Sequence, residues 1–305
     1  MSELQRHPVH RVTTCRDTLL PDQSGGGRTG EAAPVASEHW HLVLAYQGSL
    51  WHGWQKQPGV RTVQGELESR LRSIFSDTEI RTCGTSRTDA GVHALEQHVS
   101  FSTAGNHGLT PAELRQRLDR WLPPDIRVIA AEHADPSFHA RHSASAKAYT
   151  YTVCVSAHSL PFITPFVWRC GRALHAERMR EAARHLTGTM DFAAFAVNPR
   201  RSEESTVCTV HRLEIHAVGD LLFLNVIGNR FLYKMVRSIV GYLVLHAGAD
   251  PAWRPDELKT LLSSGARNPQ VQTAPAEGLF LAKVFFEEKA WHEYVPHLPP
   301  FAWTP

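Results

Sequence analysis

The chain has 305 residues, of which 42% are hydrophobic, and a net charge of +2 with neutral histidines. This is enough for a buried core, and about 150 residues per domain favours two domains. No apolar run approaches the ~20 residues of a membrane span, and the polar start lacks the apolar stretch of a secretory signal. We therefore expect a soluble, cytoplasmic protein without a membrane segment.

The cationic residues are mostly arginine, with 26 arginines and six lysines. Arginine suits phosphate and base contacts, but GC-rich codon usage produces the same bias, so both explanations stay open. The five cysteines are scattered without a C-x-x-C pair. This spacing argues against a disulfide framework and against a thiolate zinc site.

The first half of the chain alternates strand and helix signals. Residues 1–37 are glycine-rich around 23–28 and lack apolar periodicity, so we expect a disordered N-terminal extension. Alternation over 40–46 predicts a strand, and the spacing over 63–74 predicts a helix with Thr62 as its N-cap. Strands follow at 99–101 and 128–131. Between them, Thr110, Pro111 and Glu113 predict a capped helix whose buried stripe reaches Trp121.

The second half repeats this mixture. Strands are predicted at 149–155, 221–227 and 279–286, and helices at 179–186, at 232–244 and from Pro255 onward. The helix at 232–244 has the strongest apolar stripe. We predict an α+β fold with an N-terminal catalytic domain at 38–142, a C-terminal domain at 143–290 and a tail at 291–305.

The segment 83–94 carries the candidate chemistry. It is a polar, glycine-bearing loop between a helix and a strand, and such a loop can present Asp89 on a rigid support. Arg87 and Asp89 could bind a substrate together. Asp-Ala-Gly is equally an ordinary turn, in which the aspartate bonds its own backbone.

Five ordered blocks between residues 39 and 287 resemble the tRNA pseudouridine synthase A family. The most specific is Arg-Thr-Asp-Ala-Gly-Val-His-Ala at 87–94. The others lie at 53–55 with 63–68, at 138–151, at 191–195 with 231–241, and at 276–281. Ser86, Glu96 and Arg230 depart from the family's usual residues, and none of these changes removes a catalytic group.

The resemblance implies the roles of single residues. Asp89 is the expected nucleophile, Arg237 its cationic partner, and Tyr149 the residue that stacks on the target base and serves in proton transfer. The alternatives are a surface arginine and an ordinary strand tyrosine, and Tyr151 is expected to be the core residue of its pair. The expected RNA contacts are Arg87, Tyr149, Arg230, Lys234 and Leu279. The alternative for Arg87 is an ion pair that only shapes its loop, and the alternative for Leu279 is an ordinary core residue.

The resemblance also implies a pseudouridine synthase fold of two related domains around a central, largely antiparallel sheet. The expected reaction is isomerisation of uridines at positions 38 to 40 of the tRNA anticodon arm. It involves no redox change, so no cofactor is expected, and the expected partners are tRNA and a second subunit of a homodimer.

Two other function classes are compatible with parts of the sequence. One is an RNA-binding module without catalysis, which the joint presence of Asp89, Tyr149 and Arg237 disfavours. The other is a metal-dependent hydrolase that uses some of the 19 histidines. His93 with His98, or His139 with His142, are close in sequence, but no H-E-x-x-H pattern is present. We therefore expect no metal site.

Overall fold

The computed structural model describes residues 37–105, 107–157, 161–197 and 205–296. The predicted extension lies outside these residues except for Ser37, which begins the first strand instead. Residues 297–305 of the predicted tail also lie outside them. None of the described helices is long and apolar enough to cross a membrane.

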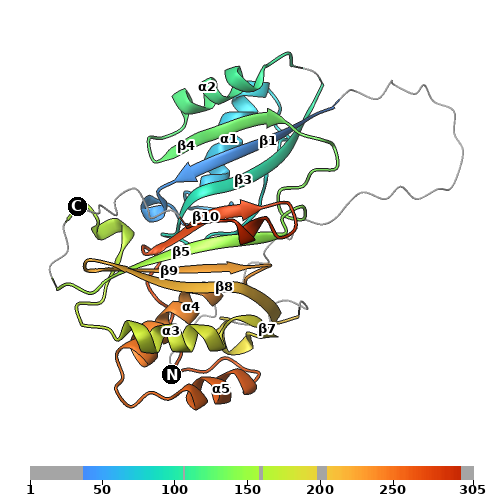
Figure 1. Ribbon diagram of the computed structural model, residues 1–305. Helices are drawn as coiled ribbons and strands as arrows, with labels where there is room; N and C mark the ends of the chain where they lie inside the picture. Colours follow the sequence, from blue (N-terminus) through green and yellow to red (C-terminus); the bar gives the residue numbers. More distant parts are fainter. Residues whose placement is uncertain (1–36, 106, 158–160, 198–204, 297–305) are drawn as a thin grey trace, which may run out of the picture. The chain divides into compact units, whose positions relative to one another are not determined.

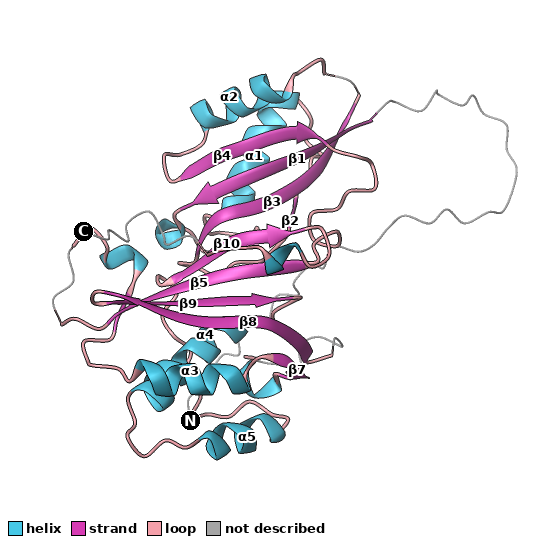
Figure 2. Ribbon diagram, viewed as in Figure 1, coloured by secondary structure: helices cyan, strands magenta, loops and turns pink. Residues whose placement is uncertain are grey.

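One ten-stranded sheet runs through the described chain in the order β4-β1-β3-β10-β5-β9-β8-β7, with β2 paired to β3 and β6 to β5 (Figure 2). Most neighbours are antiparallel, whereas β10 runs parallel to β3, and β5 to β6. The strands are β1 Ser37–Tyr46, β2 Cys83–Gly84, β3 His93–Ala104, β4 Ile126–His133, β5 Ala146–Cys154, β6 Trp168–Arg169, β7 Gly188–Asp191, β8 Val207–Val218, β9 Leu221–Gly228 and β10 Leu279–Phe285. With helices packed beside this sheet, the predicted α+β class is confirmed.

The helices of the N-terminal half begin where the sequence predicts. In α1, Val63–Phe75, the N-cap Thr62 accepts a hydrogen bond from the Gly65 amide. In α2, Pro111–Trp121, Thr110 and Glu113 form the predicted capping box. These side chains satisfy amides that have no partner within the helix. Trp121 was wrongly placed in the buried stripe, since 43% of it is exposed.

The C-terminal half contributes α3 Ala176–His185, α4 Met235–Tyr242 and α5 Pro255–Ser263. The helix predicted from residue 232 begins at Met235, because Lys234 adopts a left-handed conformation with φ of 60°. The same helical segment continues as a π-helix, η5, over Leu243–Gly248. Short 3-10 turns lie at η1 Gly48–Leu50, η2 Thr164–Phe166, η3 Ala193–Phe195 and η6 Ala290–His292.

The two halves meet at β10, whose partners are β3 of the first half and β5 of the second (Figure 1). Residues of both halves belong to one hydrophobic cluster, which includes Trp40 and Leu67 as well as Tyr151 and Ile239. The predicted domain boundary at 142–143 falls in the loop between β4 and β5 and stays a prediction. The join at β10 places the β2–β3 loop of one half close to β5 and α4 of the other.

Candidate active site

A pocket of about 280 Å³ lies where the two halves join. Its walls come from the loop at 85–89, from β5, and from residues 231–237 at the start of α4. Leu279 of β10 also lines it. This volume is near the lower end of the range of roughly 300–1,000 Å³ that is common for small-ligand sites. The predicted residues Arg87, Asp89, Tyr149, Lys234, Arg237 and Leu279 all line this pocket.

The loop that carries Asp89 is fixed by close backbone packing. Gly53 has a φ of 88°, and a Cβ at that position would lie 2.7 Å from the Thr88 carbonyl oxygen. The next amide, of Trp54, donates to the same oxygen at 3.0 Å. The Val92 amide donates to the Asp89 carbonyl at 3.1 Å. Asp89 therefore sits on a turn that is held from both sides, and Gly53 permits the close approach.

A buried amide side chain holds the start of this loop. Gln97 has no exposed surface and accepts a hydrogen bond from the Ser86 amide at 3.1 Å. Its own amide group donates to the Ser86 carbonyl at 2.6 Å. Tyr46 and Thr88 share a further buried hydrogen bond of 2.7 Å. These bonds fix the loop to β1 and β3.

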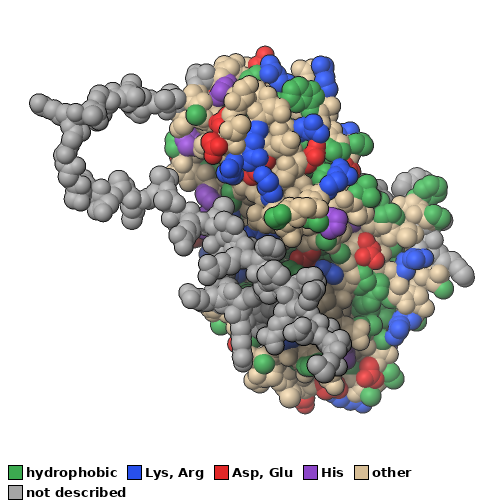
Figure 3. Space-filling view, turned by 180° about the vertical axis from the view of Figure 1, so that it is seen from behind, with side chains coloured by type: hydrophobic (Ala, Val, Ile, Leu, Met, Phe, Trp, Pro, Cys, Tyr) green, Lys and Arg blue, Asp and Glu red, His purple; other side chains and the backbone are tan. Residues whose placement is uncertain are grey.

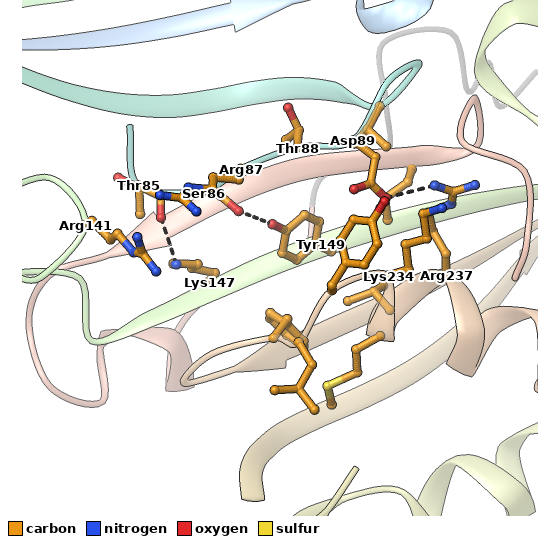
Figure 4. A pocket seen from close by; sticks show the side chains of 17 residues that line it. Thr85, Ser86, Arg87, Thr88, Asp89, Arg141, Lys147, Tyr149, Lys234 and Arg237 are labelled. Carbon is orange, nitrogen blue, oxygen red and sulfur yellow. Dashed lines mark hydrogen bonds and ion pairs between the residues drawn. The ribbon is translucent and has the colours of Figure 1, made fainter. Parts of the chain in front are cut away.

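Asp89 and Arg237 lie together although 148 residues separate them in the chain. An Nη1 of Arg237 lies 2.8 Å from Oδ2 of Asp89, and the side chains are 13% and 17% exposed. Figure 4 shows this contact between Asp89 and Arg237. The Nε of Arg237 donates to the Ala274 carbonyl at 2.8 Å, which orients the guanidinium. The Asp89 side chain is thus held by a charge-assisted hydrogen bond and still lines the pocket.

Tyr149 is 7% exposed, and its ring stands perpendicular to Phe231 at a centroid distance of 5.2 Å. Its hydroxyl shares a hydrogen bond of 2.5 Å with Ser86 Oγ. Burial and the charge of Asp89 raise the pKa of Tyr149 to about 12, although the bond to Ser86 opposes the shift. Tyr149 is therefore protonated at neutral pH. Ser86, one of the departures from the family pattern, supplies the hydroxyl that contacts it.

The other predicted contacts differ in position. Arg87 is exposed at the pocket, and Leu279 is 5% exposed in its wall. The Lys234 ammonium lies 5.0 Å from the ring centroid of Tyr233, which is itself 51% exposed. Arg230 is not among the residues that line the pocket, and its guanidinium donates to the carbonyl groups of Ser205 and Val207.

Two cationic pocket residues were not predicted. Lys147 of β5 donates to the Thr85 carbonyl at 2.9 Å, and Arg141 lies beside it in Figure 4. A signal for Lys147 was present in the sequence, because it lies two residues before Tyr149 in a strand and so shares its face. Its contact with Thr85, which is 62 residues away in the chain, could be identified only from the fold.

We expected the histidines to have structural roles, and His93 and His98 each contact other groups of the protein. His93 accepts from the Gly48 amide at 2.9 Å, and its Nε2 lies 3.1 Å from two carbonyl oxygens. His98 contacts His41 at 2.7 Å and Glu96 at 2.8 Å. Glu96, another departure, also pairs with Lys283 at 2.7 Å. Among the described residues, no group of three or more ligand side chains could hold a metal ion.

Charge is concentrated at this pocket. Its lining includes five cationic side chains and a single carboxylate, whereas the whole chain has a net charge of only +2. The cationic residues are Arg87, Arg141, Lys147, Lys234 and Arg237. Further Lys and Arg side chains gather over the upper half of the face shown in Figure 3, the half that contains α1. The pocket therefore favours a polyanionic ligand.

Comparisons with known proteins agree with this chemistry. A family profile described as tRNA pseudouridine synthase matches residues 42–143 and 182–287. A "tRNA pseudouridine synthase A" of Geobacillus kaustophilus (strain HTA426) is 41% identical over 247 residues, which cover 81% of this chain and 94% of that protein. Proteins of the same name from Bacillus subtilis (strain 168) and Thermoanaerobacter sp. (strain X514) are 39% and 37% identical, each over 80% of this chain and 98% of the relative. The chain therefore belongs to the tRNA pseudouridine synthase family, whose members isomerise uridine in tRNA.

Proposed function

We propose that this enzyme converts uridines at positions 38 to 40 of the tRNA anticodon arm to pseudouridine, with Asp89 as the nucleophile. The observation that carries the proposal is the pairing of Asp89 with Arg237 at 2.8 Å inside a cation-lined pocket. Arg237 orients the carboxylate through a charge-assisted hydrogen bond, and the rigid loop holds it at a fixed position. A preorganised charged group of this kind can act on a nucleoside without a change of conformation.

The reaction breaks the N1–C1′ bond, turns the uracil, and forms a C5–C1′ bond; the C5 hydrogen leaves as a proton, and N1 gains one. Asp89 acts by adding to C1′, by adding to C6, or by assisting removal of the C2′ proton. A covalent route would divide one difficult step into two easier ones. No electrons are gained or lost, so the chemistry needs no redox cofactor.

Tyr149 is proposed to stack on the uracil and to take part in proton transfer at C5. Its hydroxyl is protonated at neutral pH, which suits a group that first donates a hydrogen bond to the base. Leu279 is proposed to press on the opposite face of the base. Both residues line the pocket at low exposure.

The target uridine must leave the stem to enter this pocket, which costs a few kcal/mol. Arg87 is proposed to occupy the vacated space or to bind the neighbouring phosphate. Lys234 is proposed to contact RNA at the pocket, and Arg230 to do so outside it. We further propose that the enzyme acts in the cytoplasm as a homodimer whose subunits both contact the tRNA.

Mapping of the modified positions tests this proposal. Purified enzyme would be given tRNA transcripts in which only one of positions 38, 39 and 40 is uridine, and pseudouridine would be located by chemical modification and primer extension. We expect product at these positions, and product only elsewhere in the tRNA would refute the assignment. Release of tritium from C5-labelled uridine would exclude the alternative of RNA binding without catalysis.

A further inference from the structure

Within the described part of the chain, the partly buried pocket cation Lys147 has no counter-ion. The Lys147 ammonium donates one hydrogen bond to the Thr85 carbonyl, which is neutral. Among the described residues, no carboxylate lies within ion-pair distance of Lys147 or of Arg141 beside it. The buried carboxylate of Glu68, by contrast, has a cationic partner, because Arg72 lies 2.7 Å from it.

The positive charge of Lys147 is therefore not compensated by a nearby negative group of the described chain. Burial and the charge of Arg141 lower the pKa of Lys147 to about 8, against the opposing effect of Cys83. Arg87 lies in the same pocket wall, and the strand partners opposite Lys147 are the uncharged Gly228 and Val284. An ammonium has three N–H donors, so two remain for a ligand. An anion bound here would remove the cost of an uncompensated charge.

The position of Lys147 identifies the kind of anion. Lys147 and Tyr149 are on the same face of β5, about 7 Å apart along the strand. This is comparable with the separation of the base and the phosphate within one nucleotide. In Figure 4, Lys147 and Arg141 lie at one end of the pocket and the Asp89–Arg237 pair lies at the other. A nucleotide whose base reaches Tyr149 can therefore place a phosphate beside Lys147.

We propose that Lys147 and Arg141 form a subsite for one phosphodiester group adjacent to the target uridine. The inference rests on the proposed function, because the pocket must receive a nucleotide. The proposal assigns a position to one phosphate of the RNA. By holding this phosphate, Lys147 would set how deeply the nucleotide enters the pocket.

The test combines side-chain and phosphate changes. Lys147→Met keeps the aliphatic stem and removes the charge, whereas Lys147→Arg keeps a charge that does not titrate in this range. Lys259→Met is the matched control, since Lys259 lies on α5 outside the pocket and pairs with Asp256. Binding would be measured with an anticodon-arm RNA and with versions in which one phosphate beside the target uridine is an uncharged methylphosphonate.

We expect one methylphosphonate to weaken binding by the unaltered enzyme and by Lys259→Met about tenfold. Lys147→Met should bind the intact RNA about tenfold more weakly, show no further loss with that methylphosphonate, and have a salt-dependence slope smaller by about 1. Affinity of the unaltered enzyme should also fall as pH rises above about 8, while Lys147→Arg keeps its affinity.

Two results would overturn the subsite. One is a methylphosphonate penalty in Lys147→Met equal to that in the unaltered enzyme at every position tested. The other is an unchanged salt slope in that variant, which would leave only the structural bond to Thr85. Tritium release by the unaltered enzyme separates this proposal from the proposed function. If release is normal and either of these two results is found, only the subsite is refuted. If there is no release, the proposed function is refuted.

Discussion

Acid is expected to destabilise this protein through His93, a residue of the same segment, 87–94, as Asp89. His93 is 1% exposed, and its Nδ1 accepts a hydrogen bond from the Gly48 amide. Its Nε2 therefore carries the proton and faces the carbonyl oxygens of Pro165 and Glu277. These contacts satisfy a neutral ring. Burial lowers the pKa of His93 to about 4, from 6.5 in an exposed histidine.

The sign and size of the effect follow from these two pKa values. Between pH 6.5 and about 4, the unfolded chain binds a proton at His93 and the folded protein does not. The free energy of unfolding therefore falls as the pH is lowered through this window. A shift of this size corresponds to about 3 kcal/mol, which is fully lost below about pH 4. Above pH 6.5 His93 contributes no pH dependence.

Urea unfolding followed by tryptophan fluorescence, from pH 7.5 to 4, measures this loss. Because other groups also titrate, the informative quantity is the difference from His93→Gln, which has no ionisable ring. We expect the unaltered protein to lose about 3 kcal/mol more than the variant across the window. His52→Gln, at an exposed position, is the control and should follow the unaltered protein. Parallel profiles for the unaltered protein and His93→Gln would refute the reasoning.

Three further predictions concern the pocket. Arg237→Met should lower turnover at least 100-fold with little change in tRNA affinity, because the proposed nucleophile Asp89 loses its counter-charge. Single-turnover kinetics would show this loss, and a loss of affinity alone would contradict it. Tyr149→Phe should lower the rate by about 10² or more if the hydroxyl transfers a proton, whereas unchanged single-turnover rates would leave only stacking. Gly53→Ala should destabilise the protein and reduce activity, because its Cβ would lie 2.7 Å from the Thr88 carbonyl. Gly59→Ala is the control, because Gly59 also has a positive φ but a Cβ there would meet nothing within 4 Å. If both variants lost the same stability in thermal unfolding, the contact with the Thr88 carbonyl would be excluded as the cause.

Local signals in the sequence were sufficient for several elements. The N-caps Thr62 and Thr110 mark the starts of α1 and α2, because capping depends on residues within one turn. The start of α4 was predicted three residues early, since nothing in the apolar stripe reveals the left-handed Lys234. The strand β8 was not predicted, and an irregularity in its register between Val210 and Arg212 interrupts its alternation.

The site required more than periodicity. Asp89 was found through its resemblance to the family signature, because the turn alone allowed a structural interpretation. Arg237 falls within the helix predicted at 232–244, but its contact with Asp89 depends on how β10 joins the two halves. The bonds of Gln97 to Ser86, and of Lys147 to Thr85, depend on strand register. Such long-range contacts are not encoded in any local pattern.

The measurement closest to the central claim is tritium release from tRNA labelled at C5 of uridine, with the unaltered enzyme, Asp89→Ala and Asp89→Asn. Both variants should retain tRNA affinity, because the five cationic side chains of the pocket remain. We expect release by the unaltered enzyme and none above background by either variant. Near-normal release by Asp89→Ala would contradict a nucleophilic role for this carboxylate.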